Sequence, residues 1–172
     1  VIMSSTRTMG ISLTDVSTDQ QLPLGFQYHQ PSDSVNNYGE RVWVYIFNDE
    51  ASTGMTQGQV VYRDPSATTH DWWGGLIAPV TAHQAKAMVL GFVQHAIAAG
   101  SYGFILAKGV GSVKTGDGAL TLDTPFTSGG ATTVGTVLDY ADDTAGANVG
   151  VLGHAATAIT ADTIANAWID VL

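Results

Sequence analysis

Short apolar runs, each ended by turn-forming residues, recur along the chain. The densest covers residues 41–47, where β-branched and aromatic side chains follow one another with almost no polar alternation. Such a composition favours a strand, and the missing alternation indicates that both faces are covered. Further candidate strands of the same kind are residues 22–29, 58–63, 86–94, 101–108, 119–122, 134–140, 148–152 and 167–172.

Short strands at this spacing, with glycine between them, predict an all-β protein. We expect a small β-barrel or β-sandwich, β-tulip-like in shape, that forms a single domain over residues 22–172. One or two short helical turns are expected within it. Residues 81–99 also have the propensity of a helix, although Gly91 and the neighbouring Val and Phe residues count against this for the second half.

The connections between strands follow from turn composition. Residues 64–79 are expected to form a loop, and residues 111–133, rich in Gly, Thr and Ser, are expected to form turns around the short strand at 119–122. Residues 96–100 predict at most one helical turn, closed by Gly100 in a left-handed conformation.

The first 21 residues differ from the rest of the chain. They are polar, carry scattered apolar residues and show no sustained period, so they cannot bury enough surface alone to offset chain entropy. We predict an extended N-terminal arm over residues 1–21 that is ordered only by docking; a disordered tail is the alternative. Its removal is expected to leave residues 22–172 folded. The expected docking points are Ile2, Met3, Met9, Ile11, Leu13 and Val16.

A weak internal repeat is present. Residues 91–96 match residues 150–155 at a separation of 59 (150 − 91), and each segment precedes a small-residue stretch and an apolar strand. The match predicts a unit of strand, tight turn and strand that is used twice, with His95 and His154 at equivalent positions.

Composition and charge exclude several classes of protein. The chain has 172 residues, a net charge of −9 and no cysteine. Six dispersed basic residues cannot build a face for nucleic acid, and the missing thiols exclude disulfides and thiolate chemistry. No apolar run reaches about 18 residues, so we expect no membrane span, and no leader sequence is expected. The low charge suits a protein in contact with other protein.

No residue pattern indicates catalysis, a metal or a cofactor, and we predict that the protein is not an enzyme. The five histidines, His29, His70, His83, His95 and His154, include no pair at the i,i+4 spacing of a helical zinc site. The nucleophile-elbow and phosphate-loop patterns are absent. Acidic pairs at 49–50 and 142–143 are interpreted as solvated turns, with calcium at the second as an alternative and an Asp/His hydrolase as the least favoured one.

Trp72 and Trp73 stand together in a Gly-flanked loop, which is the most unusual local feature. Three interpretations remain open: the rings stack on a sugar, bury against a neighbouring subunit, or close the end of the chain's own barrel. Trp43 and Trp168 lie in strand-like runs and are expected in the core.

Several segments resemble small β-domain proteins of tailed-phage virions, which include head decoration (cement) proteins. The strongest is Ala96-Ile97-Ala98-Ala99-Gly100-Ser101-Tyr102-Gly103-Phe104-Ile105, followed by Lys108-Gly109. Residues 39–45, 55–61 and 22–25 and the apolar C-terminal strand are also similar. The resemblance covers roughly residues 22–172.

The resemblance implies a non-enzymatic virion structural protein. It would bind the major capsid protein on the outer capsid surface, at capsomer junctions, and stabilise the head against internal DNA pressure. A homo-oligomer, with a trimer as one form, is expected there, without direct contact with nucleic acid or membrane. The alternatives are a neck, tail or head-fibre-base virion protein and, from another class, a carbohydrate-binding β-module that uses Trp72 and Trp73.

Overall fold

The computed structural model describes residues 7–8, 10–32, 39–65, 70, 72–78, 86–129, 134–140 and 150–172. Within them the chain is almost wholly β, with one 3₁₀ turn, η1. The elements are β1 (Arg7–Thr8), β2 (Ile11–Ser12), β3 (Gln27–Gln30), β4 (Arg41–Asn48), β5 (Val60–Arg63), β6 (Gly74–Leu76), η1 (Lys86–Met88), β7 (Val89–Phe92), β8 (Tyr102–Lys114), β9 (Pro125–Ser128), β10 (Val137–Asp139), β11 (Gly153–Ala155) and β12 (Ile164–Asp170).

Five strands close into a barrel in the order β4–β8–β7–β5–β6 and back to β4. The pairing of β4 with β6 is parallel, and the other pairings in this ring are antiparallel. β3 is added to β4 outside the ring. The prediction of an all-β protein with a small barrel is therefore confirmed.

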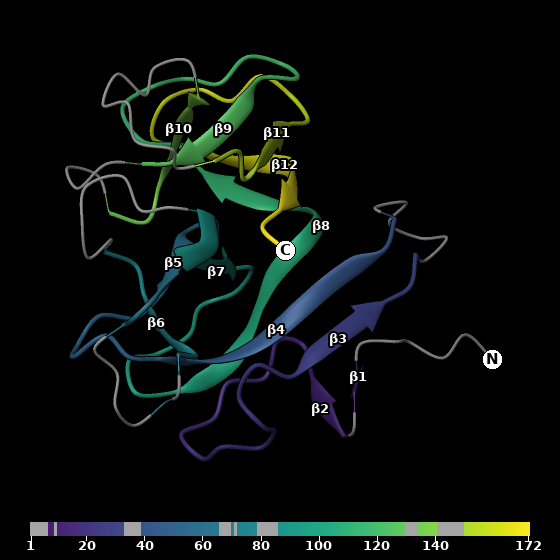
Figure 1. The fold of residues 1–172 in the computed structure, drawn as a ribbon, viewed down its shortest axis with the longest axis vertical. Coiled ribbons are helices and arrows are strands. Elements are labelled where there is room, and N and C mark those ends of the chain that lie inside the picture. The colour runs from purple at the N-terminus through teal and green to yellow at the C-terminus, as the bar shows by residue number, and fades with distance from the viewer. Residues whose placement is uncertain are drawn as a thin grey trace.

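β8 belongs to the barrel and also to a second ring of strands. It is 13 residues long, so that its first half pairs within the barrel and its second half within the second ring. The second half of β8 pairs with β12, and β11, β9 and β10 follow. A parallel bridge between Thr115 and Val137 brings β10 back to the end of β8. Figure 1 shows β9–β12 at one end of the molecule, β3–β7 at the other, and β8 running between them.

The two rings are copies of one structural unit. Met55 and Ile97 exchange backbone hydrogen bonds of 2.8 and 3.0 Å in the first ring. Leu120 and Ile159 exchange two of 2.8 Å in the second. The strands correspond in order: β4 to the second half of β8, β5 to β9, β6 to β10, β7 to β11, and the first half of β8 to β12.

The expected repeat therefore exists, but its register is not the one that the sequence match indicates. Ile97 and Ile159 are equivalent, which gives a separation of 62 (159 − 97) rather than 59. In this register His95 corresponds to Thr157 and His154 to Phe92, so the two histidines are not equivalent. The identities at a separation of 59 arise because Gly and Ala are common in this chain.

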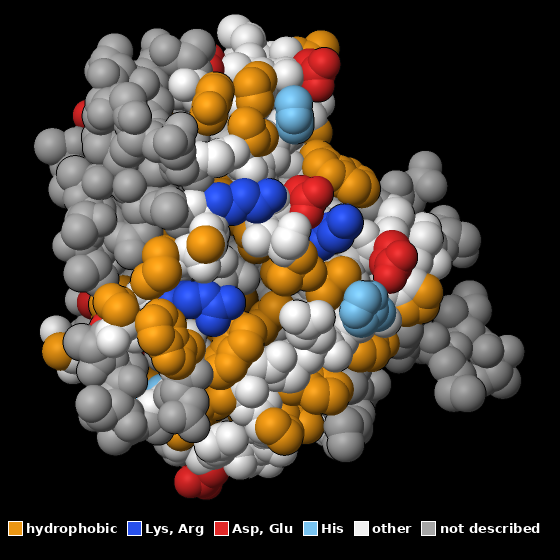
Figure 2. All heavy atoms as spheres, in the orientation of Figure 1, with side chains coloured by type: hydrophobic (Ala, Val, Ile, Leu, Met, Phe, Trp, Pro, Cys, Tyr) orange, Lys and Arg blue, Asp and Glu red, His pale blue; other side chains and the backbone are white. Residues whose placement is uncertain are grey.

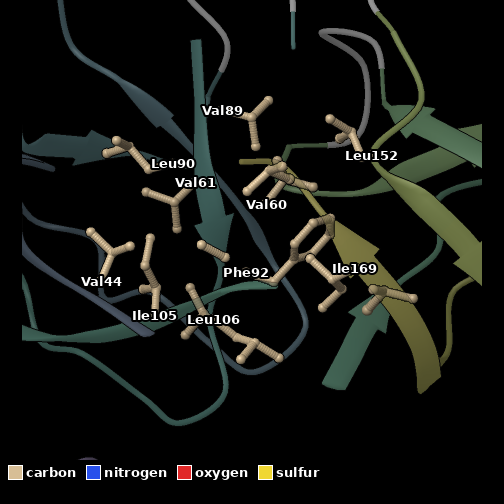
Figure 3. Packing of buried hydrophobic residues seen from close by; sticks show 14 of the residues in the cluster. Val44, Val60, Val61, Val89, Leu90, Phe92, Ile105, Leu106, Leu152 and Ile169 are labelled. Atoms are coloured by element: carbon tan, nitrogen blue, oxygen red, sulfur yellow. The ribbon is translucent and has the colours of Figure 1, made fainter. Parts of the chain in front are cut away.

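One continuous hydrophobic core joins the rings. Figure 3 shows Val44 and Ile105 of the first ring at one side and Leu152 and Ile169 of the second at the other, with Phe92 between them. Phe92 also meets Phe126 edge to face, with ring centroids 6.1 Å apart. The two units therefore pack as one body.

Several expected elements differ from the observed ones. β6 lies inside the segment predicted to be a loop, and β9 inside the segment predicted to be turns. In the segment 96–100, Ile97 bridges to Met55 and no helical turn forms, but Gly100 has the expected left-handed conformation, with φ of 69°. Of the alternative helix at 81–99, residues 81–85 lie outside the described residues, and the rest is η1, β7 and their connections.

The described part of the N-terminal arm packs against the chain's own barrel. Leu13 is 4% exposed and belongs to the core. Ser17 pairs with Tyr102 at the start of β8, and the Gln21 N–H donates to the Tyr45 hydroxyl at 3.2 Å. The described residues of the arm are therefore docked on the chain's own barrel, where Ser17 pairs with the start of β8; docking of the arm on another protein stays a prediction.

Candidate functional site

Exposed aromatic side chains are the features of this surface that point to contact with another molecule. Trp72 is 56% exposed and Trp168 is 43% exposed. No group of three or more His, Asp or Glu side chains able to hold a metal ion occurs among the described residues. The helix search over the same residues finds none that is long and apolar enough to cross a membrane.

The two adjacent tryptophans point in different directions. Trp73 is partly buried and packs on the core, whereas Trp72 extends into solvent. The Trp72 backbone has φ of 71°, and its carbonyl accepts a hydrogen bond from Arg63 Nη1 at 3.2 Å. Because a positive φ is unusual for a bulky residue, this geometry indicates a backbone fixed by its surroundings.

Trp73 packs against both Arg63 and Gly25. The Arg63 guanidinium carbon lies 4.5 Å from the centroid of the indole ring, in cation–π geometry. A Cβ added to Gly25 would lie 2.7 Å from Trp73 Nε1, so the indole also rests directly on the glycine backbone. Burial lowers the pKa of Arg63 from its ordinary value. Trp73 is thus packed within its own chain, and of the two tryptophans only Trp72 remains open to a partner.

His70 fixes the same loop from within. Its ring stacks on Phe47 with centroids 3.7 Å apart, and its Nδ1 lies 3.6 Å from an Asp49 carboxylate oxygen. That distance is longer than a hydrogen bond. His70 therefore supports the loop by ring packing beside an acidic group.

The expected docking residues of the arm are only partly placed. Ile2, Met3 and Met9 lie outside the described residues. Ile11 packs against the core and Leu13 is buried in it, so neither faces outward, whereas Val16 is 37% exposed. Of the predicted contact residues, Val16 and Trp72 are the ones that the structure leaves open to solvent.

Trp168 was expected in the core, and the structure places it outside instead. Ile164, Asn166 and Trp168 are exposed along β12, whereas Ala167 and Ile169 between them are buried. The alternation of polar Asn166 and Asp170 with buried Ala167 and Ile169 was the signal for this orientation, since successive residues on a strand face opposite sides.

Two hollows flank Trp168 on this face. One, of about 270 Å³, is lined by His29, Glu40, Val42, Lys108 and Trp168. The other, of about 380 Å³, is lined by Lys86, Val151, Gly153, His154, Trp168 and Asp170. The indole therefore forms a ridge between two shallow depressions where the two units meet. We call this the Trp168 face.

The Trp168 face is less acidic than the chain as a whole. Lys86 and Lys108 line its hollows, and Lys114 lies on the same outer side of β8. Lys108 Nζ lies 3.9 Å from Asp170 Oδ1, beyond hydrogen-bond length. Figure 2 shows basic, acidic and histidine side chains gathered among apolar ones near the middle of the molecule. Such a mixture of one aromatic ridge and scattered charges is typical of a protein contact surface.

Comparison with known proteins gives one similarity of fold. No protein-family model matches the chain, and no curated protein sequence does. Among solved structures, the N base of the head fiber of bacteriophage phi29 is similar, with a TM-score of 0.49 and 11% sequence identity. The similarity covers 75% of this chain and 95% of that one. No functional argument follows from a likeness of this degree.

Proposed function

We propose that the chain is a virion structural protein that binds the outer surface of a phage head as a decoration protein. The observation that carries the proposal is the sequence resemblance over roughly residues 22–172. The β-domain that the resemblance implies agrees with the observed fold. The sequence predicted Trp72 as a contact residue and Trp168 as a core residue, but both side chains are exposed. Exposed aromatic side chains of this kind supply much of the binding energy at interfaces.

In this proposal the partner is the major capsid protein. Many identical contacts around a shell add through multivalency, so each contact can be weak. A homo-oligomer over a capsomer junction, a trimer among the options, would increase the number of contacts per molecule further.

Immunogold labelling of purified particles tests the location. Regular label over the head is expected for a decoration protein. Label confined to the neck, tail or fibre bases, the last being the assembly to which the similar phi29 structure belongs, would overturn decoration but keep the virion proposal. Particles without label would overturn both.

Substitution of the exposed aromatics tests the surface. Trp72→Ala and Trp168→Ala are each expected to lower the amount of protein bound per particle by about tenfold, since loss of an interface anchor costs about 1–2 kcal/mol or more. Leu172→Ala is the matched control, because Leu172 is a similarly exposed apolar residue outside both hollows. Equal binding by all three variants would contradict the assignment of these two anchors.

For the carbohydrate-binding alternative, only one of the two tryptophan rings is accessible to a sugar. Trp73 is packed on Gly25 and under Arg63, so only Trp72 is available for stacking on a sugar. A glycan array on which Trp72→Ala removes a positive signal would restore this alternative. An array without signal would remove it.

A further inference from the structure

In the first unit, Ser17 forms an isolated antiparallel bridge with Tyr102 at the start of β8. The Ser17 N–H donates to the Tyr102 carbonyl at 3.2 Å, and the Tyr102 N–H donates to the Ser17 carbonyl at 2.8 Å. The neighbouring pair Asn48–Ser101 is hydrogen-bonded, since the Asn48 N–H donates to the Ser101 carbonyl. Hydrogen-bonded pairs alternate with non-hydrogen-bonded ones, so the N–H and carbonyl of Tyr102 point away from β4. The pair Phe47–Tyr102 is therefore a non-hydrogen-bonded pair of the ladder.

The second unit presents the same edge at the start of β12. Ile164 is the counterpart of Tyr102, at the separation of 62 that relates the units (164 − 102). Ile164 pairs with Lys114, and the Thr115 N–H bonds to the Thr163 carbonyl at 3.0 Å. The pair Ile164–Lys114 is therefore also a non-hydrogen-bonded pair, and the N–H and carbonyl of Ile164 point away from β8.

Within the described part of the chain, no strand pairs with this second edge. β11 pairs with β12 at Ala167–Ile169, which places Ala156 opposite Asn166, and no bridge involves Ile164 on that side. Ile164 is 48% exposed. An exposed strand edge with unpaired backbone groups is a template for an added strand.

We propose that the edge of β12 at Ile164 binds a short segment of a partner protein by backbone pairing, as Ser17 pairs with Tyr102 in the first unit. The occupied edge of the first unit indicates what kind of segment fits: a short stretch like residues 15–17, which follow a turn, with a small polar residue at the pairing position. Lys114, directly beside Ile164 on β8, favours an acidic residue near that position, where the segment of the first unit carries Asp15. The proposal rests on the fold and the equivalence of the units, not on the proposed virion function.

The test uses the full chain, labelled with ¹⁵N, and a synthetic peptide of residues 10–22 as the probe. A saturable shift of the Ile164 amide signal is expected. Ile164→Pro removes the outward N–H without touching the ladder to β8, so it should weaken binding by about tenfold. Leu172→Glu, two residues beyond the C-terminal end of β12, is the control and should bind like the unaltered chain.

Ile164→Glu is the second variant if the proline impairs folding, since a glutamate at this position repels the acidic probe peptide and leaves the backbone unchanged. It should also weaken binding. Shifts confined to Tyr102, or none at millimolar peptide, would overturn the proposal. Self-association of the chain that Ile164→Pro abolishes would identify a second copy as the occupant and overturn the assignment to a partner protein.

Discussion

The Trp72–Trp73 pair shows how a few backbone and packing details decide which side chain faces solvent. Trp72 has a positive φ and is exposed, whereas Trp73 packs on Gly25. Gly25 has φ of +77° and no room for a side chain. A single glycine, 48 positions earlier in the sequence (73 − 25), therefore orients the loop that carries the exposed indole.

Gly25→Ala is expected to destabilise the fold by about 2–4 kcal/mol, because the new methyl group displaces the Trp73 indole and the positive φ becomes strained. Gly100→Ala is the control: Gly100 has φ of +69° but open space around its Cα, so it should cost only about 1 kcal/mol. Urea unfolding of both variants measures the difference. Equal losses would show that packing against Trp73 contributes nothing.

His95 gives the fold a dependence on pH. Burial lowers its pKa from the ordinary 6.5, and the charge of Asp15 acts in the opposite direction. A lowered pKa in the folded state means that the unfolded chain takes up the proton first as pH falls. Stability is therefore full above about pH 6.5 and decreases as pH falls from there through the lowered pKa.

His95→Gln is expected to make the free energy of unfolding fall less steeply between about pH 7 and pH 5 than it does in the unaltered chain. Chemical unfolding of the variant and of the unaltered chain at several pH values gives both slopes. The same slope in both proteins would contradict a contribution from His95.

At the scale of elements, the two units show which positions their shared turn requires. Gly58 (φ +84°) donates its N–H to Val93 at 2.7 Å, and Asp123 (φ +62°) donates to Ala155 at 2.9 Å. Both turn residues have a left-handed backbone. In the first unit, however, a Cβ at Gly58 would lie 2.9 Å from the Lys114 backbone nitrogen of the second unit.

Gly58→Asp and Asp123→Gly are therefore expected to act in opposite directions. The first should destabilise by about 2 kcal/mol or more, because the new side chain meets backbone at the junction of the units. The second should be neutral or stabilise by up to about 1 kcal/mol, since it relieves a positive φ. Thermal unfolding tests the pair, and a loss of stability in Asp123→Gly would contradict the equivalence of the turns.

The elements that sequence predicts well are those whose own residues specify them. The strand at 41–47 was evident because its side chains are apolar and β-branched, and it is buried as β4. β6 consists of Gly74–Leu76 and the second half of β8 contains Gly109 and Gly111, so neither has a strand-like composition. Their conformation is imposed by pairing with distant strands, which no local pattern contains.

The candidate site divides in the same way. Composition singled out the Gly-flanked Trp72–Trp73 loop as a candidate contact site, but it left open whether both rings face a partner or close the chain's own barrel, and it did not separate the two rings. The Trp168 face depends on residues from β3, β4, β8, β11 and β12 that meet only in the folded chain. Its single sequence signal was the polar spacing along β12.

At the scale of the whole molecule, residues 10–21 pack as part of the folded domain. Deletion of residues 1–21 is expected to lower the free energy of unfolding by about 2–5 kcal/mol, because Leu13 leaves the core and Tyr102 loses its backbone partner. Urea unfolding measures the loss, and Leu13→Ala in the full chain should account for a large share of it. An unchanged midpoint would mean that this segment contributes nothing to stability.

The long strand β8 also gives the molecule a mechanical property. It belongs to both rings, and ladders to β4 and β12 run along its two halves. A tensile load along β8 acts across these hydrogen bonds, so the strand can slide only if many of them break at the same moment. Loading in shear resists force far better than opening a ladder one bond at a time. The shared strand therefore makes the two rings rigid along the direction in which β8 points.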